Sequence, residues 1–181
     1  MRHSVAVAIT LGVCVAAACN PFYSVEQSDV ERGYRFLRRG EFSLAISTFQ
    51  RTLGSYPNSG LAHLGLADGF SASGRELDAI DMYTRALPLF TDAPRGEQTI
   101  GKKTFSYQNQ GLTFPYGVAA YIHFHRGLAY EALAKKHPDR RNEYVAAAKS
   151  DYTTADTLAP TWHVPRERLK CFEEPTASNC K

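Results

Sequence analysis

The residues of this 181-residue chain that could hold a metal ion or act as nucleophiles are its six histidines and four cysteines. His123 and His125 are two residues apart, and on a helix this spacing directs the two side chains to different faces rather than toward one ion. No cysteine pair has zinc-finger spacing, because Cys171 and Cys180 lack a second pair to complete a site. The sequence therefore predicts no metal ion and no other cofactor.

Catalytic groups are equally sparse. Glu173 and Glu174 are adjacent carboxylates near the C-terminus, where we expect solvent rather than a substrate. The segment 65–69, Gly-Leu-Ala-Asp-Gly, lies inside a helical pattern and indicates close packing rather than a phosphate-binding loop. We predict that the protein is not an enzyme. The alternative, catalysis by His123, His125 or Glu131 in a groove, would be favoured by a bound metal.

The composition is that of a soluble globular protein, with 44% hydrophobic and 22% charged residues. The formal net charge of +3 comes from 21 basic and 18 acidic residues. This excess is too small to predict a nucleic-acid partner, for which we expect a clustered basic face. The length indicates one domain with a core of its own.

The N-terminus has the pattern of an export signal. Arg2 and His3 precede an apolar run from Val5 to Ala18 that ends in three alanines. The run is shorter than the roughly 20 residues needed to span a bilayer, and its small-residue end is typical of a cleaved signal peptide. We predict that residues 1–18 form this signal; the alternative is a buried helix that Asn20-Pro21 would stop.

Residues 16–19, Ala-Ala-Ala-Cys, resemble the lipobox of bacterial lipoproteins, although Ala16 replaces the usual Leu. The resemblance implies a fatty-acylated (palmitate-type) Cys19 as membrane anchor, residues 19–25 as a tether and, because Asn20 rather than Asp follows, a periplasm-facing place on the outer membrane. Removal of Cys14 with the signal leaves three cysteines, of which lipidation would occupy one. Cys171 and Cys180 can then close a disulfide, as export permits. The alternative is cleavage after Ala18, which gives a soluble periplasmic protein.

An internal repeat governs the middle of the chain. Gly40 and Gly74 are 74 − 40 = 34 residues apart, and the same shift places Phe49 on Tyr83. Gly40 permits the backbone conformation that ends a helix, and the small Ala45 lets two helices approach closely. This 34-residue pattern resembles the tetratricopeptide repeat (TPR), a helix–turn–helix unit.

A third copy of the pattern is longer. His123, Gly127 and Tyr130 match its first helix, whereas Ala148 and Tyr152 match its second. We interpret His123, and the equivalent His63, as packing histidines. Nine extra residues fall around 135–143, where His-Pro-Asp at 137–139 breaks the helix and Asn142 could cap the next one. The resemblance implies an all-α fold, an α-solenoid of about three TPR-like helix pairs over residues 26–160.

Two segments lie outside the repeats. Residues 91–115 are too long for a normal turn between units. Within them, 103–107 and 112–114 alternate around the turn-forming 108–111, which fits a β-hairpin; an extended loop is the alternative. For the C-terminal segment 161–181 we predict a helix over 164–170 that covers the apolar face of the last repeat, followed by the cysteine loop.

TPR proteins use a concave groove lined by the first helix of each pair, and this resemblance assigns groove positions here. They are Val30, Tyr34, Leu37, Arg38, Leu64, Asp68, Ser71, Ala72, Tyr121, Phe124, Leu128 and Glu131. Their mixed chemistry suits a peptide or helix of a protein partner; coverage by the insertion is the alternative. A second candidate surface consists of Phe105, Tyr107, Phe114 and Tyr116.

The sequence thus predicts an adaptor or assembly factor that binds a protein partner in the bacterial cell envelope. Small TPR lipoproteins include pilotins of pilus and secretion systems and factors that help to insert outer-membrane proteins; the resemblance does not choose among them. The alternative is a soluble periplasmic TPR subunit of an enzyme or cell-wall complex. Self-association also stays open, because few repeats leave apolar ends exposed.

Overall fold

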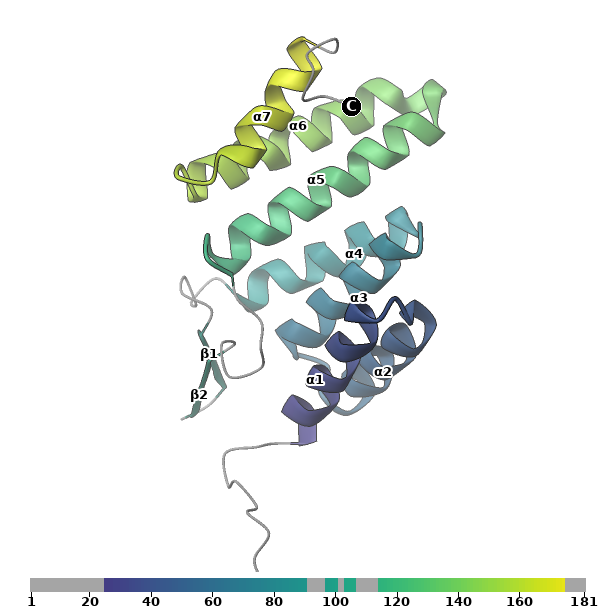
Figure 1. Ribbon diagram of the computed structural model, residues 1–181, viewed down its shortest axis with the longest axis vertical. Coiled ribbons are helices and arrows are strands. Elements are labelled where there is room, and N and C mark those ends of the chain that lie inside the picture. Colours follow the sequence, from purple (N-terminus) through teal and green to yellow (C-terminus); the bar gives the residue numbers. More distant parts are fainter. Residues whose placement is uncertain (1–24, 91–96, 101–102, 107–113, 175–181) are drawn as a thin grey trace, which may run out of the picture.

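A computed structural model describes residues 25–90, 97–100, 103–106 and 114–174 of the chain, and these form an all-helical body with one small hairpin (Figure 1). The α-helices are α1 (Val25–Arg38), α2 (Phe42–Ser55), α3 (Gly60–Ala72), α4 (Glu76–Ala86), α5 (Val118–Lys136), α6 (Arg141–Leu158) and α7 (His163–Glu173). Short 3-10 turns are η1 (Leu87–Leu89) and η3 (Pro138–Arg140). The helical fold class is confirmed.

The helices are arranged in chain order. Each packs against the next from α1 to α7, and α1 also contacts α3. Figure 1 shows the result as successive layers, with α1 and α2 at one end of the body and α6 and α7 at the other. Such local packing brings α1, α3 and α5 near one another although they are far apart in sequence.

The turns after α1 and α3 have the same geometry. Gly40 and Gly74 each have a φ of 75°, a left-handed conformation that glycine adopts without steric cost. The backbone N–H groups of Glu41 and Arg75 donate to the carbonyls of Phe36 and Phe70, at 3.0 and 2.9 Å. The backbone conformation therefore repeats with the 34-residue period of the sequence.

The core also repeats. Phe49, Tyr83 and Tyr152, the aromatic residues at equivalent positions, are all 0% exposed. Phe49 lies where a Cβ on Gly33 or Gly65 would come within 2.6 or 2.3 Å of its ring. This ring therefore fits between α1 and α3 only because both helices present a glycine to it.

The third unit accommodates its extra residues as longer helices. α5 has 19 residues and α6 has 18, against 14 in α1 and 14 in α2. The predicted break at 137–139 is confirmed, because α5 ends at Lys136 and η3 follows. Asn142 is not the N-cap: α6 begins one residue earlier, and Arg140 occupies the cap position without a side-chain cap bond.

A β-hairpin lies within the 91–115 segment, and one of its strands is at a position where the alternation predicts a strand. Strand β1 (Glu97–Ile100) pairs antiparallel with β2 (Lys103–Ser106). The first predicted strand corresponds to β2, and its partner β1 precedes it in the chain. The predicted turn 108–111 and residues 112–113 of the second predicted strand lie outside the described residues. Residues 97–100, Glu-Gln-Thr-Ile, do not alternate between polar and apolar side chains, so the sequence does not indicate a strand there.

Helix α7 occupies the place predicted for a C-terminal helix and packs on α6. Cys171 on α7 is disulfide-bonded. Cys180, the signal 1–18, Cys19 and the tether to residue 24 lie outside the described residues, so the pairing with Cys180 and the lipid anchor stay predictions. No helix among the described residues has the length and apolar character needed to cross a membrane.

Candidate functional site

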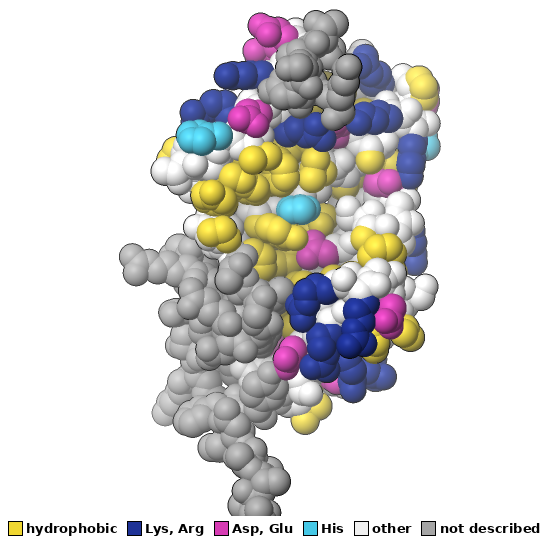
Figure 2. Space-filling view, in the orientation of Figure 1, with side chains coloured by type: hydrophobic (Ala, Val, Ile, Leu, Met, Phe, Trp, Pro, Cys, Tyr) yellow, Lys and Arg dark blue, Asp and Glu magenta, His cyan; other side chains and the backbone are white. Residues whose placement is uncertain are grey.

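An open cleft of about 540 Å³ lies where α1, α3 and α5 come together. Figure 2 shows this face, on which hydrophobic side chains gather over α5 beside a basic cluster over α1. The cleft is lined by Tyr34, Leu37, Arg38, Phe42, Asp68, Ser71, Ala72, Tyr83, Tyr121 and His125. Its volume is that of a typical ligand site.

The cleft brings together part of the predicted groove. Among its lining residues are Tyr34, Leu37, Arg38, Asp68, Ser71, Ala72 and Tyr121, all assigned from the repeat register. The sequence analysis missed Phe42, Tyr83 and His125. Phe42 and Tyr83 come from α2 and α4, the second helices of their units, which the register does not assign to the groove. The place of His125 is fixed only by the packing of α5 on α4.

Two predicted groove residues are core residues instead. Val30 is 1% exposed and Leu64 is 0% exposed, and both belong to the main hydrophobic cluster. Since the side chains are enclosed by neighbouring helices, they are not available to a partner. The register identified the correct helices but placed these residues on the wrong side of them.

The predicted residues at the other end of α5 lie outside the cleft. Phe124 is 8% exposed and packs against Trp162 with ring centroids 4.8 Å apart. Leu128 lies in the same cluster as residues of α6 and α7. Glu131 accepts a 2.9 Å hydrogen bond from Tyr152 and pairs with Arg168 of α7. These contacts tie α5 to α6 and α7.

Asp68 is the acidic group of the cleft. Its Oδ1 accepts a 2.7 Å hydrogen bond from the Tyr83 hydroxyl, and its Oδ2 accepts a 3.4 Å bond from the Tyr121 hydroxyl. Burial raises the pKa of Asp68 from 3.8 to about 7, although both tyrosine bonds oppose this change. The same contacts and burial raise the pKa of both tyrosines, which stay neutral donors. Among the described residues, no basic side chain pairs with Asp68.

His125 forms part of the aromatic wall. Its ring lies 4.0 Å from Tyr121, centroid to centroid, and 5.5 Å from Phe124. Burial lowers the pKa of His125 to about 4, so the imidazole is neutral at neutral pH. Within the described part of the chain, no three His, Cys, Asp or Glu side chains are placed to bind a metal ion.

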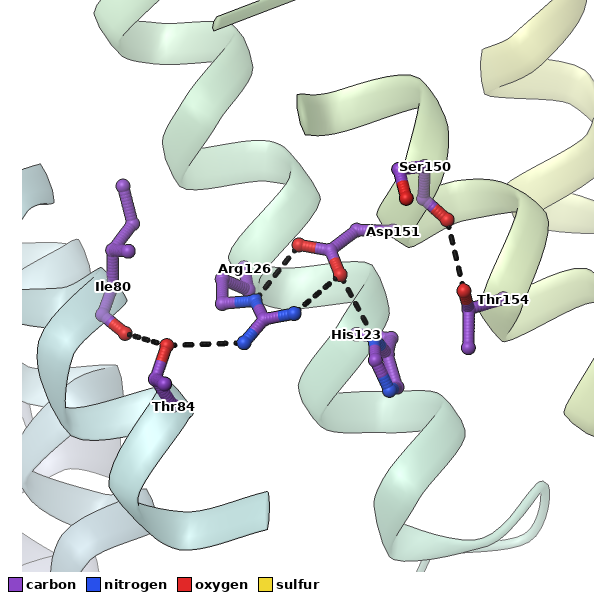
Figure 3. A network of polar contacts seen from close by, with 7 residues as sticks. All are labelled: Ile80, Thr84, His123, Arg126, Ser150, Asp151 and Thr154. Atoms are coloured by element: carbon purple, nitrogen blue, oxygen red, sulfur yellow. Dashed lines mark hydrogen bonds and ion pairs between the residues drawn. The ribbon is translucent and has the colours of Figure 1, made fainter. Parts of the chain in front are cut away.

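A second buried carboxylate, Asp151 on α6, lies in a different environment (Figure 3). Arg126 on α5 donates two hydrogen bonds to it, at 2.7 and 2.8 Å, and His123 Nδ1 donates a third at 2.8 Å. Arg126 also donates to the Thr84 hydroxyl on α4 at 3.0 Å. Burial opposes ionisation of Asp151, but the bonds from Arg126 and His123 outweigh it and lower the pKa of this carboxyl. The network therefore joins three helices.

The two histidines interpreted as packing residues have polar roles. His123 is a partner of Asp151, as described above. His63 Nδ1 lies 3.0 Å from the backbone carbonyl of Ser59, one turn earlier. Both rings are partly buried, and Nδ1 of each takes part in a hydrogen bond in addition.

Of the second candidate surface, the described residues place two side chains, those of Phe114 and Tyr116. Phe114 packs edge-on against Tyr121 at 5.1 Å, and Tyr116 stacks on Trp162 at 5.2 Å with 2° between the ring planes. Phe105 lies in β2, and Tyr107 is outside the described residues. Phe114 and Tyr116 therefore contact two different parts of the body, the cleft wall and the start of α7.

No protein-family model matches this chain, and no curated protein matches it. Its function has to be interpreted from the cleft and the repeated packing themselves. The cleft offers an apolar and aromatic lining with one carboxylate, Asp68, and one exposed guanidinium, Arg38.

Proposed function

We propose that this protein is a TPR-like adaptor that binds a segment of a protein partner in the cleft between α1, α3 and α5. The observation that carries the proposal is the cleft itself, an open volume of about 540 Å³ lined from five helices. Its wall mixes aromatic rings with Arg38, Asp68 and Ser71, so a peptide could bury apolar side chains and satisfy polar ones there.

The repeated geometry supports the TPR-like part of the proposal. Matching glycine turns follow α1 and α3, and buried aromatics recur on α2, α4 and α6. Backbone bonds from Tyr56 to Thr52 and from Ser59 to Tyr56 have counterparts 103 residues later, at Ala159 and Trp162. Stacked helix pairs of this kind present their first helices on one continuous face.

The location is part of the same proposal. The apolar run before Cys19 and the Ala-Ala-Ala-Cys sequence favour an exported lipoprotein, held at the periplasmic face of a bacterial outer membrane. A pilotin-like role, or a role in secretion or outer-membrane assembly, fits an anchored adaptor without catalytic groups. A free periplasmic subunit is the second candidate, favoured if Cys19 is unmodified.

Site-directed photocrosslinking tests the adaptor role. A photoreactive phenylalanine analogue replaces Ala72, which is exposed and lines the cleft, or Ser43, which is exposed on α2 and does not. We expect one discrete adduct from position 72, absent from position 43 and lost when Ser71→Trp fills the cleft. Equal adducts from both positions, or none at 72, would contradict the proposal.

A separate measurement tests the anchor. The intact mass and membrane partitioning of the full-length protein are compared with those of Cys19→Ser in a Gram-negative host. We expect an acylated, membrane-bound wild type and a soluble variant. If both are soluble and differ only by the substitution, the protein is a free periplasmic one, and crosslinking should be repeated in the soluble fraction.

A further inference from the structure

The most distinctive group in the cleft is a carboxylate that no basic side chain among the described residues neutralises. Asp68 is half-buried among tyrosines, and the bonds that it accepts come from two neutral hydroxyls. Burial raises the pKa of Asp68 to about 7, and the two tyrosine bonds offset this only in part. A carboxylate in this position is stabilised by any cation that enters the cleft.

We propose that the recess formed by Asp68, Tyr121 and His125, with the buried Tyr34 and Tyr83 behind them, binds the side-chain ammonium of a lysine in the partner protein. This inference rests on the proposed function, since it names the group that the cleft selects in a bound segment.

The hydrogen-bond inventory of the recess fits an ammonium group. A carboxylate has about four lone-pair sites, of which the two tyrosine bonds use two. The hydroxyls of Tyr83 and Tyr121 donate to Asp68; Tyr83 is fully buried, whereas Tyr121 is partly exposed and keeps a lone pair that a ligand can reach. A lysine ammonium, with three donors and no acceptor, can bond to these sites, whereas a bidentate guanidinium needs both carboxylate oxygens facing it.

The walls of the recess suit the rest of a lysine side chain. Tyrosine rings attract cations electrostatically, and the attraction is greatest where water is excluded. The neutral His125 adds a further ring without adding a competing positive charge. Leu37 and Ala72 offer apolar contact for the four-carbon stem.

Arg38 limits which lysines would fit. It is exposed at the edge of the same cleft, next to other arginines of α1. A strongly basic segment would be repelled by this cluster, while an acidic residue beside the lysine would be attracted. We therefore expect a lysine with an acidic neighbour rather than a polybasic sequence.

Peptide selection on the full-length protein tests the inference. A phage-displayed random heptapeptide library is selected against the wild type, Asp68→Asn and Asp81→Asn; Asp81 is an exposed aspartate of α4 paired with Arg85. We expect lysine to be enriched at one position with the wild type and with Asp81→Asn, but not with Asp68→Asn. The amide keeps the size and one oxygen of the carboxylate, so loss of folding is not the expected cause.

Synthetic peptides then measure the contact itself. A double-mutant cycle compares the best lysine peptide with a variant in which glutamine replaces the lysine. We expect the replacement to reduce affinity about tenfold for the wild type and about twofold or less for Asp68→Asn. Affinity of the lysine peptide should rise between about pH 6 and pH 8 as Asp68 ionises. Over this range His125, Tyr83 and Tyr121 stay neutral, so the rise should be absent in Asp68→Asn.

Several outcomes would overturn the inference. If the selected peptides lack lysine but fail to bind Ser71→Trp, the cleft binds peptides without using the lysine recess. The adaptor proposal would then stand, and the lysine inference would be wrong. The same conclusion follows if arginine replaces lysine without loss, or if choline competes at concentrations at which N-acetyl-lysine amide does not. If no sequence is enriched at all and crosslinking at position 72 also fails, both proposals fall together.

Discussion

Asp68 and Asp151 both lie between helices, but their surroundings shift the pKa of their carboxyl groups in opposite directions. Asp151 receives three hydrogen bonds from Arg126 and His123, and its pKa is lowered. Asp68 receives two bonds from neutral tyrosines, and its pKa is raised to about 7. Both carboxylates lie between helices, so the difference comes from the partners rather than from the depth alone.

The comparison distinguishes a carboxylate whose charge is neutralised by neighbouring side chains from one whose hydrogen-bond donors are neutral. The charge of Asp151 is neutralised within the molecule, and the arginine that neutralises it also reaches α4. Asp68 borders the open cleft, and no basic side chain in the described part of the chain pairs with it. Groups that cost stability in the free protein are candidates for binding, because selection on folding alone would remove them.

Loss of the structural carboxylate should have the largest effect. Asp151→Asn leaves the largely buried Arg126 guanidinium without its anionic partner, and we expect a decrease of about 3 kcal/mol in the free energy of unfolding. Urea denaturation followed by far-ultraviolet circular dichroism measures it. Asp81→Asn, which breaks an exposed pair with Arg85, is the control and should cost less than about 0.5 kcal/mol. Equal losses would remove the contrast between the two sites.

The corresponding substitution in the cleft, Asp68→Asn, should increase the free energy of unfolding at alkaline pH instead of decreasing it. A carboxyl whose pKa rises from 3.8 to about 7 contributes stability below about pH 4 and loses it as the pH rises through 7. The full shift corresponds to about 4 kcal/mol, which we halve to ~2 kcal/mol because the side chain borders open solvent. Asp68→Asn should therefore be more stable than the wild type at about pH 8, by denaturant titration. A lower stability of the variant at this pH would show that Asp68 has a compensating cation.

Removal of one tyrosine hydroxyl should increase the difference in pKa between Asp68 and Asp151. In Tyr83→Phe the 2.7 Å bond to Asp68 is lost, which should cost roughly 1 kcal/mol and raise the pKa of Asp68 above 7. The carboxyl carbon resonance, followed by NMR as a function of pH, reports this pKa directly. Tyr144→Phe, on α6 away from the cleft, should leave the Asp68 titration unchanged.

The smallest effect is expected at the edge of the Asp151 network. Thr84→Val removes the hydroxyl that accepts from Arg126, but Thr84 is exposed and Arg126 keeps both bonds to Asp151. We expect a loss of less than about 0.5 kcal/mol by thermal or urea unfolding. A loss as large as that of Asp151→Asn would mean that α4 is held to α5 mainly through this threonine.

The sequence predicted the repeated elements because their signals are local. Gly40 and Gly74 mark the turns by residue type, and the 34-residue period places Ala45, Phe49 and Tyr83 in the core without knowledge of the partner helices. The same register identified most of the α1 and α3 residues that line the cleft. Periodicity carries this information because each unit packs on the next in the same way.

The remaining features depend on contacts between distant residues. The partners of Asp151 lie 25 and 28 residues earlier, and no spacing rule links an aspartate on one helix to an arginine on another. The strand 97–100 lacks alternation, so its pairing with 103–106 was invisible in the sequence. Phe124 and Leu128 were assigned to the groove because the register does not show how α7 packs beside α5 and α6.

The contact of the Phe49 ring with Gly33 and Gly65 also restricts how this sequence can diverge. An added methyl group at either glycine would overlap the ring, and a smaller residue at position 49 would leave a void between α1 and α3. Single substitutions at any of the three sites are therefore unfavourable, while a paired change of ring and glycine can preserve the packing. In relatives of this protein, these positions should vary together or stay fixed, a coupled pattern set by one aromatic ring shared between two helices.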